Sequence, residues 1–82
     1  MSAASDEALV ERIARGDQTA LQALYARHSV RIFRFVVRLL RDEGRAEDIV
    51  SEVFIDVWKS AARFEARSAV GTWLLTIARN KA

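Results

Sequence analysis

The chain has 82 residues, a net charge of +2, one histidine, three glycines, and neither cysteine nor proline. This composition excludes disulfides and thiolate metal sites and argues against a histidine metal site, and the length suits one domain, residues 1–82. No apolar run approaches the roughly 20 residues that span a bilayer, and residues 1–7 lack the features of a signal peptide. We expect a cytoplasmic protein without membrane segment, metal or cofactor, with residues 1–5 as a disordered tail.

Helical periodicity predicts an all-α fold, a compact bundle of about four helices. The first helix is expected from about residue 6 to 15, with Ser5 as its N-cap, Gly16 as its stop, and Leu9, Val10 and Ile13 inward. Asp17 then caps a second helix that continues to about residue 41 and ends in segment 42–44. Its apolar positions, at helical spacing, are Leu21, Leu24, Tyr25, Ile32, Phe35, Val36 and Leu39.

The third helix is expected from about residue 45 to 62, and the fourth from near Ser68, its predicted N-cap, to the end of the chain. The apolar positions of the third are Ile49, Val50, Val53, Phe54, Val57, Trp58 and Ala61; those of the fourth are Val70, Trp73, Leu74, Ile77 and Ala78. Because the fourth helix has no capping signal where the sequence stops, we expect the chain to be part of a longer protein.

Five arginines follow one narrow stripe of the second helix: Arg27, Arg31, Arg34, Arg38 and Arg41. Two interpretations remain open. The stripe is either a solvated face that acids of a neighbouring helix partly neutralise, or a surface that contacts phosphates or a partner, since arginine makes bidentate contacts with such groups.

The third helix has a second face opposite its apolar one, formed by Asp48, Glu52, Ile55 and Lys59. An isoleucine ringed by carboxylates is typical of a small docking patch for a basic partner helix. A charged surface with one stray isoleucine is the alternative. The acids do not form a credible catalytic pair, because nothing nearby supplies a nucleophile, metal or cofactor, so no enzymatic activity is expected.

The loop of residues 64–68 and the outer face of the fourth helix form a third candidate site. If Trp73 and Ile77 point inward, the outward residues are Thr72, Leu75, Thr76 and Arg79, with Asn80 at the boundary. Hydroxyl, amide and guanidinium groups bond base edges and phosphates, while a leucine packs on a base or sugar. A loop held between two packed helices also suits a pocket for an unstacked base. A helix surface without a function is the alternative.

These residues make the chain similar to region 2 of a bacterial RNA polymerase sigma factor, specifically the extracytoplasmic-function (ECF) group. The signature segments are AEDIVSEVFIDVW at 46–58 and TWLLTIARN at 72–80. Supporting segments are GDQTALQALY at 16–25 and RIFRF at 31–35. The four segments stand in the family's order and spacing, and the likeness covers almost everything after Ser5.

The resemblance implies that the domain docks on RNA polymerase and that it recognises and helps to melt the promoter −10 element. Docking on the β′ clamp coiled coil would use Asp48, Glu52, Ile55 and Asp56. A pocket for a flipped base would be built from Phe64, Glu65, Ala66, Arg67 and Ser68. The non-template strand would meet Thr72, Leu75, Thr76, Arg79 and Asn80, with Lys59 and Arg63 on nearby phosphates. An anti-sigma factor is an implied partner, and the −35-reading region 4 domain of this group is absent from the 82 residues.

Leu75 and Thr76 depart from the family's pattern, which often has an aromatic and a basic residue there, and the loop lacks a frequent glycine. Base stacking by this helix and the identity of the captured base are therefore open. Two other readings compete. A helix-turn-helix reader of duplex DNA would need a basic recognition helix, which the acidic third helix and the sparsely basic fourth do not supply. In a helical adaptor that binds only protein, the loop would have no binding role.

Overall fold

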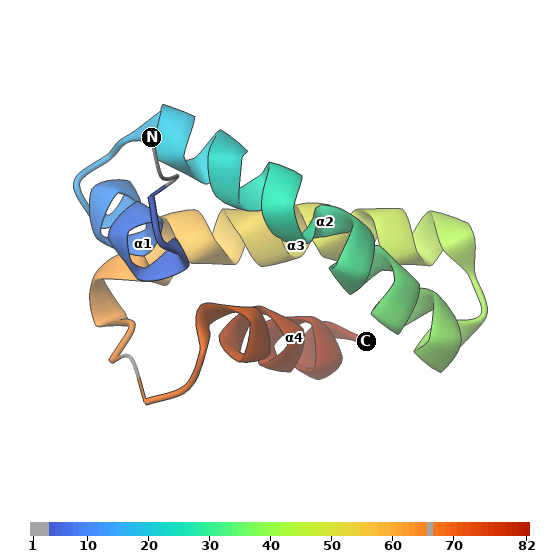
Figure 1. Ribbon diagram of the computed structural model, residues 1–82. Coiled ribbons are helices and arrows are strands. Elements are labelled where there is room, and N and C mark those ends of the chain that lie inside the picture. Colours follow the sequence, from blue (N-terminus) through green and yellow to red (C-terminus); the bar gives the residue numbers. More distant parts are fainter. Residues whose placement is uncertain (1–3, 66) are drawn as a thin grey trace.

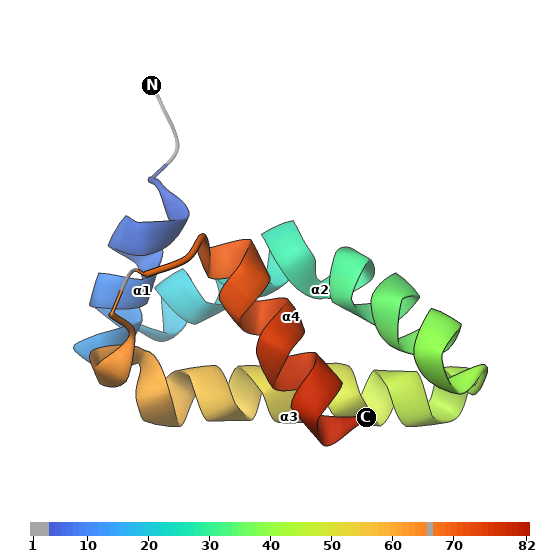
Figure 2. The ribbon, with the colours of Figure 1, turned by 90° about the horizontal axis from the view of Figure 1, so that it is seen from below.

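The computed structural model describes residues 4–65 and 67–82. Its helices are α1 (Asp6–Ala14), α2 (Gln18–Leu40), α3 (Glu43–Ser60) and α4 (Val70–Lys81), with a 3-10 turn, η1 (Ala61–Arg63), after α3. In Figure 1, α2 and α3 form a long antiparallel pair, and Figure 2 shows α4 crossing this pair. Helix α4 contacts both α2 and α3, and α1 packs on α2 and η1. The predicted all-helical bundle is confirmed; no described helix is long and apolar enough to cross a membrane.

The two predicted N-caps at the start of the chain are confirmed. The Ser5 side chain accepts a hydrogen bond from the backbone N–H of Ala8 at 3.1 Å, and Asp17 accepts one from Ala20 at 3.1 Å. Each side chain satisfies a backbone donor that has no partner within its own helix. Gly16 lies between the two caps with φ +89°, a conformation that disfavours any residue with a Cβ atom. Ser5 is thus part of the helix cap, whereas the rest of the predicted tail falls largely on residues 1–3, outside the described residues.

The turn between α2 and α3 is tighter than predicted. Segment 42–44 was expected to separate the helices, but α2 ends at Leu40 and α3 already begins at Glu43. Arg41 makes the turn in the left-handed conformation, with φ 53° and ψ 39°, and the Asp42 side chain caps α3 through the backbone N–H of Arg45 at 3.0 Å. Gly44 therefore lies in the first turn of α3. A capping aspartate supplied a start signal that outweighed the glycine.

The expected N-cap of α4 is wrong. Helix α4 begins at Val70, its N-cap position is held by Ala69, and no side chain bonds the free N–H groups there. Ser68 lies one residue too early for this role and is exposed. At the other side of the loop, α3 ends at Ser60 rather than near residue 62, because the chain tightens into η1.

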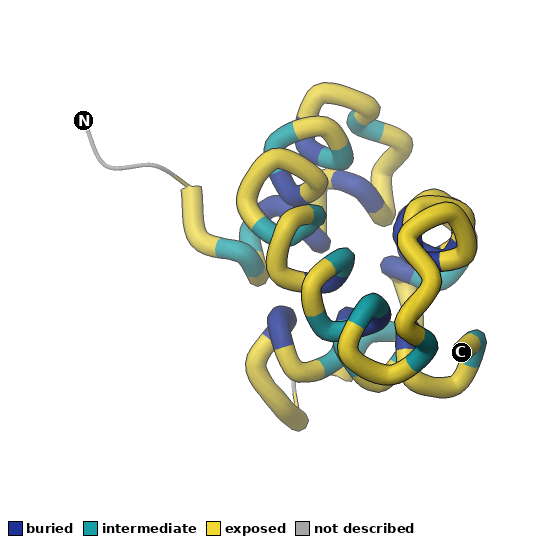
Figure 3. Tube along the Cα trace, turned by 90° about the vertical axis from the view of Figure 1, so that its right-hand side faces the viewer, coloured by how far each residue is buried: buried dark blue, intermediate teal, exposed yellow. Residues whose placement is uncertain are grey.

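The core lies where the inner faces of the helices meet. Figure 3 shows buried segments facing inward on each helix, with exposed segments outside. The predicted inward residues of α1 and nearly all of those of α3 are buried. Three predicted core residues are exposed: Tyr25 is 46% exposed, Leu39 51% and Trp58 37%. All three lie near the margins of their apolar stripes, where neighbouring helices cover them only in part. The other predicted core residues that are not fully buried are half-buried: Leu21, Phe35, Trp73 and Ile77.

Candidate functional site

The acidic face of α3, defined by Asp48, Glu52 and Ile55, points away from the core as predicted. All three residues are exposed, and Ile55 is 52% exposed although its neighbours Phe54 and Val57 are buried. The face arises because positions spaced by three or four residues share one side of a helix. An apolar side chain therefore stands in solvent next to Glu52, one turn beyond it on the face that also carries Asp48.

Asp56 is the predicted docking residue that the fold uses in another way. Its carboxylate forms an ion pair with Lys81 in the last turn of α4, with Nζ 2.9 Å from Oδ2. The Asp56 side chain is 42% exposed. This carboxylate therefore ties α3 to α4 and presents less free charge than Asp48 or Glu52.

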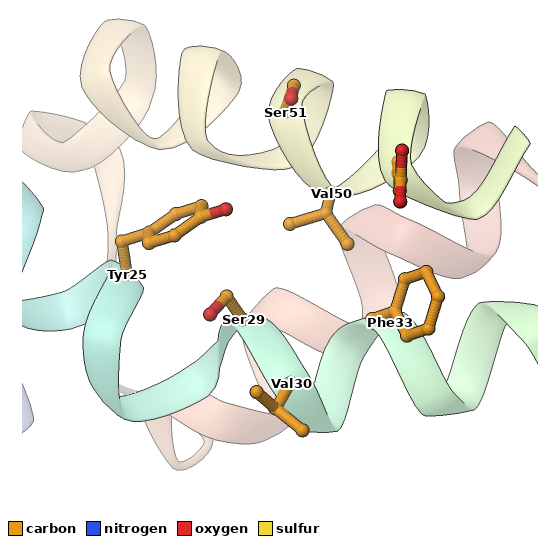
Figure 4. A pocket seen from close by; sticks show the side chains of 7 residues that line it. Tyr25, Ser29, Val30, Phe33, Val50 and Ser51 are labelled. Atoms are coloured by element: carbon orange, nitrogen blue, oxygen red, sulfur yellow. The ribbon is translucent and has the colours of Figure 1, made fainter. Parts of the chain in front are cut away.

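A shallow groove runs between α2 and α3 beside Ile55. The groove of Figure 4 is lined by Tyr25, Ser29, Val30 and Phe33 from α2 and by Val50 and Ser51 from α3. Farther along the same seam, Tyr25 and Ser51 meet Phe54, Ile55 and Trp58. The Tyr25 ring packs edge-on against Phe54 with the centroids 5.0 Å apart. The sequence interpretation missed this groove because it assigned Tyr25 and Trp58 to the core.

The loop after η1 is anchored by one aromatic contact. The Phe64 ring packs on Trp73 of α4 with the centroids 4.7 Å apart, so Phe64 is half-buried and does not stand free in the loop. Glu65 and Arg67 form an exposed ion pair at 2.8 Å, and Ser68 is exposed. Ala66, also predicted to line the base pocket, lies outside the described residues. The described polar side chains of the loop thus face solvent around a fixed aromatic anchor.

The outer face of α4 consists mainly of the predicted residues. Thr72, Thr76, Arg79 and Asn80 are exposed, and the Thr76 hydroxyl donates to the Thr72 carbonyl at 3.0 Å. Lys59 and Arg63, the candidate phosphate contacts near the loop, are also exposed. Leu75 differs from the prediction, because it is half-buried and contributes to the edge of the core. The buried line of α4 passes through Val70, Leu74 and Ala78, which puts Trp73 and Leu75 on its two flanks.

The arginine stripe of α2 divides into parts with different surroundings. Arg27 pairs with Asp6 of α1 at 3.0 Å, and His28 bonds the other oxygen of the same carboxylate at 2.9 Å. Burial raises the pKa of Asp6, but the hydrogen bonds from Arg27 and His28 outweigh it and hold that pKa below its usual value. Arg31, Arg34 and Arg38 line a groove against Leu75 of α4, and Arg27 lies at the same groove.

No described group of three or more His, Asp and Glu side chains is placed to hold a metal ion. The described residues also leave no buried side-chain polar atom without a hydrogen-bond partner.

Sequence comparisons identify the family. A family model described as Sigma-70 region 2 matches residues 24–82. ECF RNA polymerase sigma factor SigK of Mycobacterium tuberculosis is 36% identical over 77 residues, which are 93% of this chain and 41% of that protein. RNA polymerase sigma-H factor of Pseudomonas aeruginosa is 38% identical over 77 residues, which are 94% of this chain and 40% of that protein. The chain thus spans about two fifths of the length of these relatives.

A solved structure gives the same answer for the fold. An engineered region 2 of sigmaE, determined by NMR in complex with GTAAAA, is similar with a TM-score of 0.86 and 34% identity. The match covers 99% of this chain and 85% of that chain. The predicted resemblance is confirmed: the chain belongs to the sigma-70 region 2 family, and its relatives include ECF sigma factors.

Proposed function

We propose that this chain docks on RNA polymerase and recognises the promoter −10 element as single-stranded DNA, which helps to melt the promoter for transcription initiation. The observation that carries the proposal is the similarity, over 99% of the chain, to the sigmaE region 2 domain solved with GTAAAA. The surfaces described above suit both halves of this function. The acidic face of α3, with its exposed isoleucine, is available for docking, and the polar loop after η1 and the outer face of α4 are available for DNA.

The docking half of the proposal assigns the β′ clamp coiled coil to the acidic face of α3. Asp48 and Glu52 attract a basic helix over a distance, and Ile55 supplies an apolar contact that is desolvated on binding. Asp56 contributes less to this attraction than Asp48 or Glu52, because its carboxylate already forms an ion pair with Lys81. An anti-sigma factor would block the same surface, and the groove at Tyr25 and Trp58 beside it offers further apolar area.

The DNA half assigns one flipped base to the loop and the non-template strand to α4. Phe64 is held by Trp73, so the first residue of the loop is anchored before DNA arrives, which reduces the ordering entropy lost on binding. Glu65, Arg67 and Ser68 surround the base, while residues of α4 contact the strand beyond it. Unstacking a base costs a few kcal/mol, and only a base that fits the pocket offsets this cost. Recognition and strand opening are thereby coupled, in the cytoplasm where polymerase works.

The test measures binding of this domain to the purified β′ clamp coiled coil, and of labelled single-stranded GTAAAA with and without that coiled coil. A permuted strand of the same composition is the DNA control. We expect clamp binding, and a preference for GTAAAA that strengthens when the clamp is present. A folded domain that binds neither would overturn the proposal, whereas clamp binding without any DNA preference would leave a helical adaptor.

Two double variants then assign the surfaces. Asp48→Arg with Glu52→Arg should abolish clamp binding without unfolding the domain, while Glu7→Arg with Glu11→Arg makes the same charge change on α1 and should leave binding intact. Arg67→Ala with Ser68→Ala should spare docking and weaken the preference for GTAAAA. Unchanged preference in that variant would mean that the base pocket lies elsewhere.

A further inference from the structure

The groove between α2 and α4 contains a concentration of positive charge that the proposed function does not use. From α2 it is lined by Arg27, Val30, Arg31, Arg34, Phe35 and Arg38, and Leu75 of α4 completes the wall. No acidic residue lines this groove. Its chemistry is therefore guanidinium groups next to apolar surface.

These three arginines lack the neutralisation that a purely structural stripe would have. Arg27, the first of the stripe, is paired with Asp6 at 3.0 Å. Over residues 4–65 and 67–82, no Asp or Glu forms an ion pair with Arg31, Arg34 or Arg38, although the three guanidinium groups repel one another. Within the stripe, the neutralisation by an acid of a neighbouring helix is thus seen at Arg27, and the charges of Arg31, Arg34 and Arg38 are open to a partner.

The groove joins the proposed DNA face without a break. Helix α4 begins so close to α2 that a Cβ on Gly71 would stand 3.0 Å from Nη1 of Arg31. Leu75 follows one turn later, on the same helix as the exposed Thr72 and Thr76, and it contacts the arginine groove. A strand that lies on the outer face of α4 therefore meets Leu75 and then the arginines of α2.

The spacing suits a nucleic-acid backbone. Arg31 and Arg38 are seven residues apart, which is about 10 Å along a helix axis. A stacked strand carries one phosphate every ~3.4 Å, so three arginines over this length match about three phosphates. Guanidinium groups on phosphates beside apolar contacts to bases or sugars are the usual means of holding a single strand.

We propose that Arg31, Arg34 and Arg38 form a phosphate track that carries the single-stranded DNA backbone from α4, across Leu75, onto α2. The inference rests on the proposed function, because it extends the path of the same strand. An acidic protein surface is the competing occupant. The apolar Leu75 and Phe35 beside the charges, and the continuity with α4, favour the nucleic acid.

The test compares two triple variants with the same loss of charge. Arg31→Gln, Arg34→Gln and Arg38→Gln remove the charge of the track, whereas Arg12→Gln, Arg15→Gln and Arg45→Gln remove three exposed arginines outside the stripe. Binding of GTAAAA strands extended at either end is measured by fluorescence anisotropy over a range of salt concentrations, with the clamp coiled coil present. Each lost phosphate contact lowers the slope of log K against log salt by about 0.7, so the track variant should lose about 2 units of slope.

The track variant should also lose affinity by about tenfold or more, while the preference for GTAAAA over the permuted strand persists, because phosphate contacts carry no sequence information. The control triple should keep the wild-type slope. Lysine at all three track positions should restore the slope and so separates lost charge from a disturbed fold. If the glutamine triple unfolds, the double variant Arg34→Gln with Arg38→Gln replaces it, because it leaves Arg31 next to Gly71 unchanged. This double variant should lower the slope of log K against log salt by about 1.4.

The outcomes separate this inference from the proposed function. Wild-type protein that shows no preference for GTAAAA overturns the proposed function and the track with it. Normal preference in the wild type, together with an unchanged slope in the track variant, overturns the track alone. Loss of clamp binding in the track variant, with DNA binding intact, overturns it and assigns the arginines to the contact with polymerase.

Discussion

Asp56 of α3 and Lys81 of α4 form an ion pair with a 2.9 Å Nζ–Oδ2 distance, at the edge of the acidic face that includes Asp48 and Glu52. The pair links the proposed polymerase-docking helix to the proposed DNA-reading helix. Of the four docking residues expected from the sequence, Asp56 is therefore already bound to another side chain of the domain.

This ion pair predicts unequal effects of removing charge from α3. Glu52→Gln should weaken binding to the clamp coiled coil more than Asp56→Asn, because Lys81 already neutralises Asp56. Lys81→Gln frees the Asp56 carboxylate and should leave clamp binding unchanged or tighter, while lowering the free energy of unfolding by about 0.5 kcal/mol. Dissociation constants and urea denaturation measure the two effects. Equal losses for Glu52→Gln and Asp56→Asn would contradict the assignment.

The N-terminus of α4 offers a gain in stability at a position that the sequence did not indicate. Ala69 has the extended backbone of an N-cap, with φ −62° and ψ 147°, but no side-chain acceptor. Ala69→Ser should raise the free energy of unfolding by about 0.5–1 kcal/mol, since the hydroxyl bonds a free N–H group. Ser68→Ala is the matched control and should change it by less than about 0.5 kcal/mol. A larger loss from Ser68→Ala than the gain at position 69 would restore Ser68 as the cap.

The anchor of the loop is testable by a double-mutant cycle. Phe64→Leu and Trp73→Leu each remove one ring of the pair whose centroids are 4.7 Å apart. We expect a coupling energy of about 0.5–1.5 kcal/mol in urea denaturation, the range for aromatic pairs. Phe64→Leu should also weaken the preference for GTAAAA while sparing clamp binding. Additive effects of the two substitutions would mean that the rings do not stabilise each other.

Asp6 should make the domain sensitive to acid. Arg27 and His28 hold the pKa of Asp6 below its usual value despite partial burial, so its contribution is present above the unfolded-state pKa of about 3.9 and disappears as pH falls through the folded-state pKa. Asp6→Asn should cost about 1 kcal/mol at pH 7 and flatten the decline below pH ~4. Denaturation at several pH values checks this. Glu7→Gln, the same change at an exposed neighbour, should have little effect; an equal cost there would point to the helix dipole instead.

Arg41 marks a strained turn. A non-glycine residue with φ 53° is disfavoured because its Cβ approaches the carbonyl oxygen. Arg41→Gly should therefore raise the free energy of unfolding by about 0.5–1 kcal/mol in thermal or urea denaturation. Arg45→Gly, within the first turn of α3, is the opposite control and should lower it by up to about 1 kcal/mol. Destabilisation by both substitutions would mean that the Arg41 side chain stabilises the turn.

Predictions from the sequence were correct where a feature depends on residues a few positions apart, and less accurate where it depends on packing between helices. The caps at Ser5 and Asp17 were predicted correctly because each depends on a side chain and a backbone N–H three residues away. The cap at Ser68 was wrong because α4 begins only at Val70, with Ala69 in the N-cap position, and no local side-chain signal marks that start. Periodicity also placed Tyr25 and Trp58 on apolar faces without showing that they lie at the edge of the α2–α3 seam.

The sequence by itself determined the four helices, their main apolar faces, the outward acidic face at Asp48 and Glu52, and the family. These follow from 3.6-residue periodicity and from motifs read along one chain. Only the tertiary structure decided which charges are already paired: Asp56 with Lys81, Arg27 with Asp6. It also brought Leu75 of α4 against the arginines of α2, more than 30 positions earlier in the chain. Such contacts depend on how whole helices cross, and a pattern confined to one helix carries no information about its neighbour.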